Sequence, residues 1–258
     1  MQKLGVALLM LGLLLILVEP QALCQGVESY LKEGDAYFEQ YDTQKALAAY
    51  LKAYQADSSN YQAIWKLARS YIDTGEKASD EKEQKSLYLK AERLARKAVA
   101  VYPDSAEGHF QLSVAVGRVG LLEGGKKKVE LSKEVKTEAE KALELDPKHD
   151  GAHHVLARWH REVANLNWAL KAFAKILYGG LPPASNEKAI EHFKKAIEIK
   201  PEHINHHLEL GITYKMLDQW DLARAEFQKV LDLPIGDADD PEHKTEAKKL
   251  LDEIKGKK

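Results

Sequence analysis

The stretch LELGITYKMLDQWDLARAEFQKVLDL, residues 208–233, indicates how the chain folds. Gly211 and Ala223 are small enough for two helices to approach closely, and Tyr214 and Phe227 are placed to fill the space beside that contact. No insertion interrupts the pattern between these residues. The stretch therefore predicts two helices that pack against each other as a hairpin.

The same pattern recurs along the chain. Ser58, Pro103, Pro147 and Pro201 mark equivalent turns and are 45, 44 and 54 residues apart, which fits a 34-residue unit that carries insertions. In the first unit the matching positions hold Tyr30, Gly34, Tyr37, Ala46, Tyr50 and Ala53. These residues resemble the tetratricopeptide repeat, and the resemblance implies an all-α helical solenoid.

We expect this solenoid to occupy residues 27–258 and to contain about five helical hairpins. The predicted repeats lie near residues 27–60, 61–105, 106–149, 150–203 and 204–237. Asp240 and Pro241 then signal a helix start, and the predicted helix 241–256 carries Ala247, Leu250 and Ile254 on one side. Because each repeat buries its apolar face only against a neighbour, this helix is expected to cap the open end.

Composition and motifs argue against several classes of function. The 258 residues are 45% apolar and have a formal net charge of -2, so no global positive field is present to hold nucleic acid. The sequence has no nucleophile elbow, no Gly-rich phosphate-binding loop and no paired-cysteine site, so we expect no catalytic residues. Gly124-Gly125-Lys126 lacks the rest of a phosphate-binding loop and fits a solvated turn better. Residues His149 and His153, and likewise His203 and His207, are four apart. At helix starts these imidazoles are expected to be solvated or to cap, so we predict no metal site and no cofactor.

The N-terminus has the pattern of a signal peptide over residues 1–24. Lys3 precedes an aliphatic run over residues 5–18, and Pro20 ends it. Small residues at Ala22 and Cys24 favour cleavage before Gln25, which predicts a mature chain that is exported to the periplasm or secreted. An uncleaved membrane anchor and a lipoprotein acylated at Cys24 are the alternatives. Membrane association is not expected once the segment is cleaved.

The fourth unit and its insertion carry the most specific resemblance. They read Leu156-Ala157-Arg158-Trp159, then Glu162-Val163-Ala164-Asn165-Leu166-Asn167-Trp168, then Tyr178-Gly179-Gly180-Leu181-Pro182-Pro183-Ala184. This order resembles the regulator of microtubule dynamics family across residues 156–200, and the resemblance extends over most of residues 27–255. It implies a non-catalytic binding or scaffold protein associated with microtubules or organelle contacts. The signal peptide makes this chain an exported member, which leaves the microtubule role open.

The insertion over residues 163–185 is expected to form an extra amphipathic helix and a rigid turn. Its apolar side chains are more than one hairpin contact needs: Val163, Leu166, Trp168, Leu170, Phe173, Ile176 and Leu177. Packing against neighbouring repeats is the first explanation. A lid over a ligand groove, or a surface for a partner, is the second.

The first helices of the hairpins line the concave surface of a tetratricopeptide solenoid, so their outward positions predict a partner-binding groove. The candidates are Trp65, Arg69, Phe110, Val114, His154, Arg158, Arg161, Leu208 and Ile212. This set predicts an apolar groove with a basic stripe that binds a protein or peptide. The alternative is a carrier that encloses a lipid or another apolar anion between the groove and the insertion.

Overall fold

The computed structural model describes residues 20–258, apart from the side chains of residues 20–25, 125, 173, 177 and 178. In this part of the chain every regular element is a helix. The bounds are α1 Pro20–Glu39, α2 Thr43–Ala56, α3 Tyr61–Lys77, α4 Glu81–Val101, α5 Ala106–Leu122, α6 Gly125–Leu145, α7 Asp150–Ala164, α8 Trp168–Tyr178, α9 Asn186–Ile199, α10 Ile204–Met216, α11 Trp220–Asp232 and α12 Asp240–Glu253. The predicted all-α class is confirmed.

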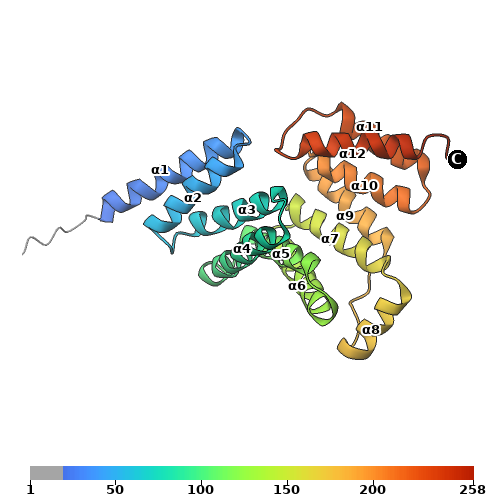
Figure 1. Cartoon of the computed structure of the whole chain (residues 1–258), viewed down its shortest axis with the longest axis horizontal. Coiled ribbons are helices and arrows are strands. Elements are labelled where there is room, and N and C mark those ends of the chain that lie inside the picture. Colours follow the sequence, from blue (N-terminus) through green and yellow to red (C-terminus); the bar gives the residue numbers. More distant parts are fainter. Residues whose placement is uncertain (1–19) are drawn as a thin grey trace, which may run out of the picture.

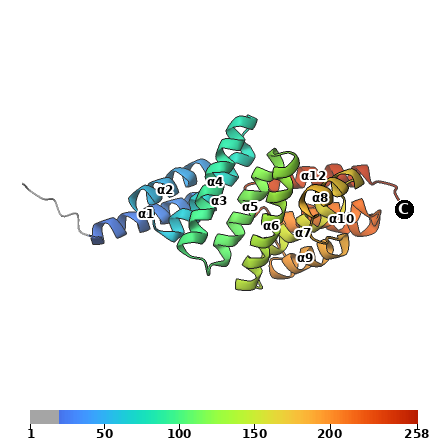
Figure 2. The same ribbon diagram turned by 90° about the horizontal axis from the view of Figure 1, so that it is seen from below.

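The helices pack as five hairpins that follow one another through the molecule (Figures 1 and 2). The pairs are α1 with α2, α3 with α4, α5 with α6, α7 with α9, and α10 with α11. Alanines on the second helices of these hairpins, among them Ala49, Ala95 and Ala196, are fully buried. Aromatic side chains such as Tyr50 and Phe227 fill the spaces beside these contacts and are also fully buried. The helical solenoid is therefore confirmed.

Two of the insertions lengthen helices. Helices α4 and α6 have 21 residues each, whereas α11, in the uninterrupted unit, has 13. The Asp80 side chain accepts a hydrogen bond from the Glu83 backbone N–H and so caps the start of α4. The prediction of a solvated turn at Gly124-Gly125-Lys126 is wrong in its extent, because α6 already begins at Gly125.

A repeated histidine ties the two helices of three hairpins together. His109, His153 and His207 each lie six residues after a proline, and each Nε2 donates to that proline's carbonyl oxygen over 2.9, 3.2 and 2.9 Å. Their Nδ1 atoms face the second helix of the hairpin, where the partners are Glu138, His192 and Glu226. The expectation that His153 and His207 are solvated or capping side chains is therefore wrong, since both are buried staples.

Helix α12 covers the end of the stack, as expected for a capping helix. Ala247 and Leu250 of this helix, and Ile254 directly after it, join the same buried cluster as Phe227 and Val230 of α11. The loop before α12 extends back toward α3 (Figure 1), and Asp239 in this loop lies 3.6 Å from the Lys77 Nζ. The two halves of the solenoid therefore approach each other on one side of the molecule.

The predicted extra helix is present as α8, at the lower edge of Figure 1. Ala174 is buried, but Trp168 and Ile176 are 82% and 80% exposed. Within the described chain, no helix is both long and apolar enough to cross a membrane. The predicted signal peptide lies mostly in residues 1–19, outside the described residues.

Candidate ligand-binding channel

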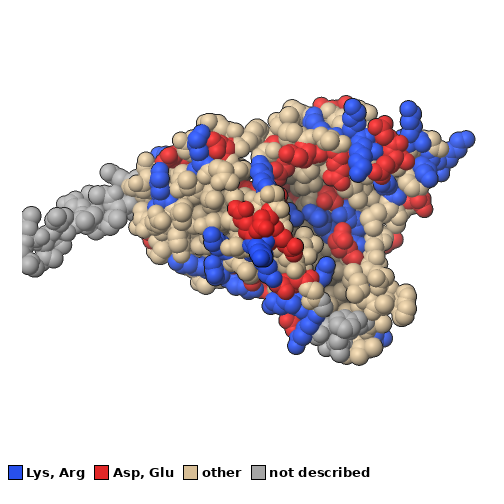
Figure 3. Space-filling view, in the orientation of Figure 1, with Lys and Arg blue, Asp and Glu red and all other residues tan. Residues whose placement is uncertain are grey.

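A cavity of about 830 Å³ lies on the inner side of the solenoid. Its wall is built mainly from the first helices of successive hairpins, α3, α5 and α7. The end of α1, part of α6, the start of α10, residues 236–239 of the loop before α12 and the start of α12 complete it. We call this cavity the channel. Figure 3 shows acidic and basic side chains interleaved around the hollow between the two halves of the molecule.

Five of the predicted groove residues line the channel, and they are Arg69, Phe110, Val114, His154 and Arg158. They come from three successive first helices, which supports the register assigned to the repeats. The Cζ atom of Arg69 lies 3.7 Å from the centre of the Phe38 ring and 5.2 Å from that of Trp65. Burial lowers the pKa of His154 well below its usual value, so this imidazole is neutral at pH 7.

The other four candidates do not line the channel. Leu208 is buried in the C-terminal core, and Ile212 packs against the same core. Trp65 stands beside the Lys66 and Arg69 cations. Arg161 is only 4% exposed.

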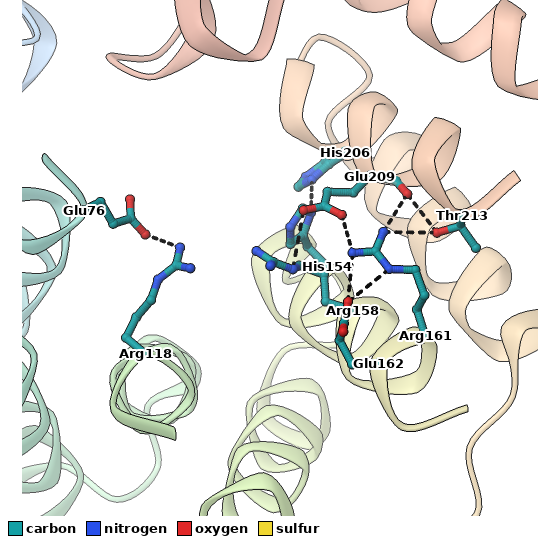
Figure 4. Close-up of polar contacts among 9 residues, drawn as sticks. All are labelled: Glu76, Arg118, His154, Arg158, Arg161, Glu162, His206, Glu209 and Thr213. Carbon is teal, nitrogen blue, oxygen red and sulfur yellow. Dashed lines mark hydrogen bonds and ion pairs between the residues drawn. The ribbon is translucent and has the colours of Figure 1, made fainter. Parts of the chain in front are cut away.

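Arg161 connects α7 to α10 inside the protein (Figure 4). One Nη atom donates to the Glu209 carbonyl oxygen over 3.0 Å and to Thr213 Oγ1 over 3.3 Å, and the other lies 2.6 Å from Glu209 Oε2. Arg158, on the channel side of the same helix, places its Nε 3.4 Å from the second oxygen of Glu209. The two arginines therefore share one carboxylate but have different surroundings.

Carboxylates form an acidic side of the channel that the sequence-based prediction missed. Burial, together with the charges of Glu76, Asp237 and Asp239, raises the pKa of Asp73 to about 7 against the opposing effect of Arg69. The pKa values of Glu76 and Asp237 are also raised, chiefly by burial and then by neighbouring carboxylates. A cation bound among these groups would relieve the repulsion between them.

Arginines stand opposite these carboxylates. Arg118 forms an ion pair with Glu76 (Figure 4), yet its Nε is buried and has no hydrogen-bond partner among the described residues. The Nε of Arg69 is in the same situation. Since a buried guanidinium N–H usually finds an acceptor, these two donors indicate a surface that is completed by a ligand or by water.

The insertion does not close the channel. Val163 lines the wall, whereas none of the described side chains of α8 does. Leu181 and Ala184, in the turn after α8, pack against the core that contains Trp159 and Val163. The packing explanation therefore accounts for the turn but not for the exposed face of α8, where a partner surface stays a prediction.

Known proteins resemble this chain over nearly its whole length. The model of the family described as regulator of microtubule dynamics protein 1-3 matches residues 30–255. Regulator of microtubule dynamics protein 1 of Bos taurus is 31% identical over 238 residues, which are 92% of this chain and 74% of that protein. Regulator of microtubule dynamics protein 3 of Rattus norvegicus is 32% identical over 146 residues, which are 57% and 31% of the two chains.

Among solved structures, a thermophilic TPR protein from Thermus thermophilus superimposes with a TM-score of 0.64 at 17% sequence identity. The match covers 86% of this chain and 98% of that one, and it supports the tetratricopeptide fold. The family is established by the sequence relatives, in agreement with the residues around Arg158-Trp159 and Gly179-Gly180. The chain belongs to the regulator of microtubule dynamics protein 1-3 family.

Proposed function

We propose that this protein is a non-catalytic scaffold whose channel binds an extended peptide segment of a partner protein. The observation that carries the proposal is the wall of the channel, which is long, continuous over three successive hairpins and charged with both signs. A peptide backbone with its side chains offers donors, acceptors and charges along its whole length. The wall therefore matches a peptide better than a ligand with one charged end.

The charge balance of the wall also indicates which side chains the partner carries. Nine Asp and Glu residues line the channel, against five Lys and Arg residues. The excess of acidic residues lies where Asp73 and Glu76 of α3 meet residues 237–240. We infer that a lysine or arginine of the partner binds at this acidic side, where partial burial strengthens the attraction.

The carrier alternative has less support. An acyl chain needs an apolar wall, and burying so many charged groups against hydrocarbon would leave them without partners. The carrier model also requires the insertion to cover the ligand, whereas the described side chains of α8 lie outside the channel. The apolar part of the wall, around Val114, Val155 and Leu121, is suited to single side chains of a peptide.

A displayed peptide library, selected on the purified protein, tests the proposal. We expect enriched peptides to contain a basic residue and the Asp73→Asn, Glu76→Gln double variant to bind them about tenfold or more weakly by fluorescence polarisation. The matched control is Trp168→Ser, which changes an exposed apolar residue outside the channel and leaves affinity unchanged. The proposal would be contradicted if the peptides bound the double variant as tightly as the Trp168→Ser control. A lipid that copurifies in native mass spectrometry would also contradict it.

We also propose that the protein is exported and that its mature form begins at Gln25. The support is the charged start, the aliphatic run and the small residues before Gln25 in the sequence. N-terminal sequencing of the protein from its native source tests this. Recovery of residues 1–24 on the mature product would contradict cleavage.

A further inference from the structure

We infer that Asp150, His203 and His206 form a binding site for a divalent transition metal of the zinc class on the wall of the channel. One ligand atom from each of the three residues lies within 4.8 Å of the other two. Asp150 is in the first turn of α7, and the two histidines stand at the start of α10, so the site joins two neighbouring hairpins. Two imidazoles and one carboxylate are a common ligand set for zinc and related ions.

The contacts of His206 suit a metal ligand. Its Nε2 lies 3.0 Å from Asp150 Oδ2, close to the separation of roughly 3.3 Å between two ligand atoms of a tetrahedral zinc ion. A metal ion can therefore replace the proton that these two atoms share. On the other side of the ring, His206 Nδ1 lies 2.9 Å from His154 Nδ1 (Figure 4).

His154 then has a defined role beside the metal ligands. When Nε2 of His206 binds a metal, its Nδ1 carries the hydrogen and can donate it to the neutral His154 imidazole. Metal-bound histidines are usually oriented by such a hydrogen bond to their second nitrogen. His154 is therefore a positioning residue that fixes the ring of His206.

His203 supplies the third ligand and has no competing contact through its Nδ1. This nitrogen is buried and has no hydrogen-bond partner among the described residues. The His203 side chain makes no capping hydrogen bond, although it is the N-cap residue of α10. Its ring is stacked on that of His206, with centroids 4.1 Å apart and planes 9° apart, so one ring has to turn for both lone pairs to reach the same ion.

The local charges agree with this assignment. The pKa of Asp150 is lowered to about 2, because the hydrogen bond and the charge of His206 outweigh its burial. Burial lowers the pKa of His203 to about 4 and lowers that of His206 as well. A divalent metal is bound by an ionised carboxylate and by the neutral form of each imidazole. All three residues line the channel, so a further coordination position faces its interior.

Metal titration of the purified full chain, freed of metal with a chelator, tests the site. We expect one equivalent of Co²⁺ to bind with visible d–d absorption and one equivalent of Zn²⁺ to displace it. His203→Ala and Asp150→Asn should each lower the Zn²⁺ affinity at least tenfold. His154→Ala should lower it about 10- to 100-fold, as expected for a residue that orients a ligand.

His192→Ala is the matched control. His192 belongs to a second group of imidazoles, with His153 and His160, that has no converging carboxylate among its contacts. This variant should bind Zn²⁺ like the original protein. Circular dichroism of each metal-free variant separates lost folding from lost binding, and Asp150→Asn keeps the side-chain volume. Absence of stoichiometric binding, or equal affinity in His203→Ala, Asp150→Asn and the original chain, would overturn the inference.

Discussion

Arg161 is a buried cation on which the contact between α7 and α10 depends. Its side chain is 5% exposed, and that of its partner Glu209 is 11% exposed. Arg161→Ala leaves this carboxylate buried with only Arg158 nearby, at 3.4 Å, so we expect a loss of about 3–5 kcal/mol in unfolding free energy. Arg158→Ala, at the channel wall, should cost less than about 1 kcal/mol. Urea denaturation compares them, and equal losses would contradict the structural role of Arg161.

Two glycines on first helices offer a matched test of helix packing. A Cβ atom at Gly211 would lie 2.6 Å from the Phe227 ring, whereas one at Gly117 would lie 3.5 Å from a Val135 methyl group. Gly211→Ala should therefore destabilise the protein by about 1–3 kcal/mol through overpacking. Gly117→Ala should be neutral or stabilise it by up to about 1 kcal/mol, because alanine favours the helix. Thermal melting measures both, and the reverse order would disprove the packing model at Gly211.

The sequence predicted the surroundings of a single side chain correctly only where that face of its helix has one neighbour. Arg158 and Arg161 are three residues apart, so they point about 60° from each other around α7. That difference places Arg158 at the channel and Arg161 against α10. Sequence spacing alone does not show where the neighbouring hairpin ends and the channel begins. For the same reason the sequence did not show that Leu208 lies in the core and that Ile212 packs against it.

Helices α7 and α9 are joined by imidazoles whose burial predicts acid sensitivity. His153 and His192 contact each other through Nδ1 atoms 2.9 Å apart, and the ring of His160 stacks on that of His192. Burial lowers the pKa of all three, that of His192 to about 4. Between pH 6.5 and about 4 the unfolded chain therefore binds more protons than the folded one, and stability falls as the pH falls.

Urea denaturation from pH 7.5 to pH 4.5 measures this dependence. His192→Gln removes one titrating group, so its stability should fall less steeply over the same range. The exposed-site variant Trp168→Ser is the control and should follow the original protein. If the unfolding free energy of His192→Gln fell with pH as steeply as that of the original protein, His192 would not contribute to the acid sensitivity.

The helices and their pairing into hairpins could be predicted from local features of the sequence. Gly211 and Ala223 were predicted at a helix contact, and α10 and α11 pack there as a hairpin. The staples of His109, His153 and His207 could have been found from their constant spacing after proline. The exposed face of α8 could not, because an apolar stripe does not reveal whether a neighbour covers it.

At the scale of the whole molecule, the repeats predicted the fold but not the composition of the channel. The acidic side is formed by residues about 160 positions apart, Asp73 and Glu76 on α3 and Asp237 and Asp239 before α12. They meet because the solenoid curves, and its curvature accumulates from small rotations between hairpins. No local pattern in the sequence shows how large this total curvature is. The basic stripe was therefore predicted in part, and the opposing carboxylates were not.

Because these carboxylates face each other across the channel, we expect the channel to widen as the pH rises. Asp73, with a pKa of about 7, is mostly protonated at pH 5.5 and ionised at pH 8.5. Its ionisation adds repulsion against Asp237 and Asp239 on the far side of the channel. The opposing Lys77–Asp239 pair is well exposed at 40% and 37%, so it resists this repulsion only weakly.

Spin labels at Ser79 and Ile235, with Cys24 replaced by Ser, report the distance between the two sides. We expect the distance distribution to shift to longer values between pH 5.5 and pH 8.5. In Asp73→Asn the side chain keeps its volume but cannot ionise, so the shift should shrink or disappear. High salt should also reduce it, since exposed charges are screened over about 10 Å at 0.1 M. If the labels move equally in Asp73→Asn, another group controls the closure of the solenoid, and the acidic side has only a local role.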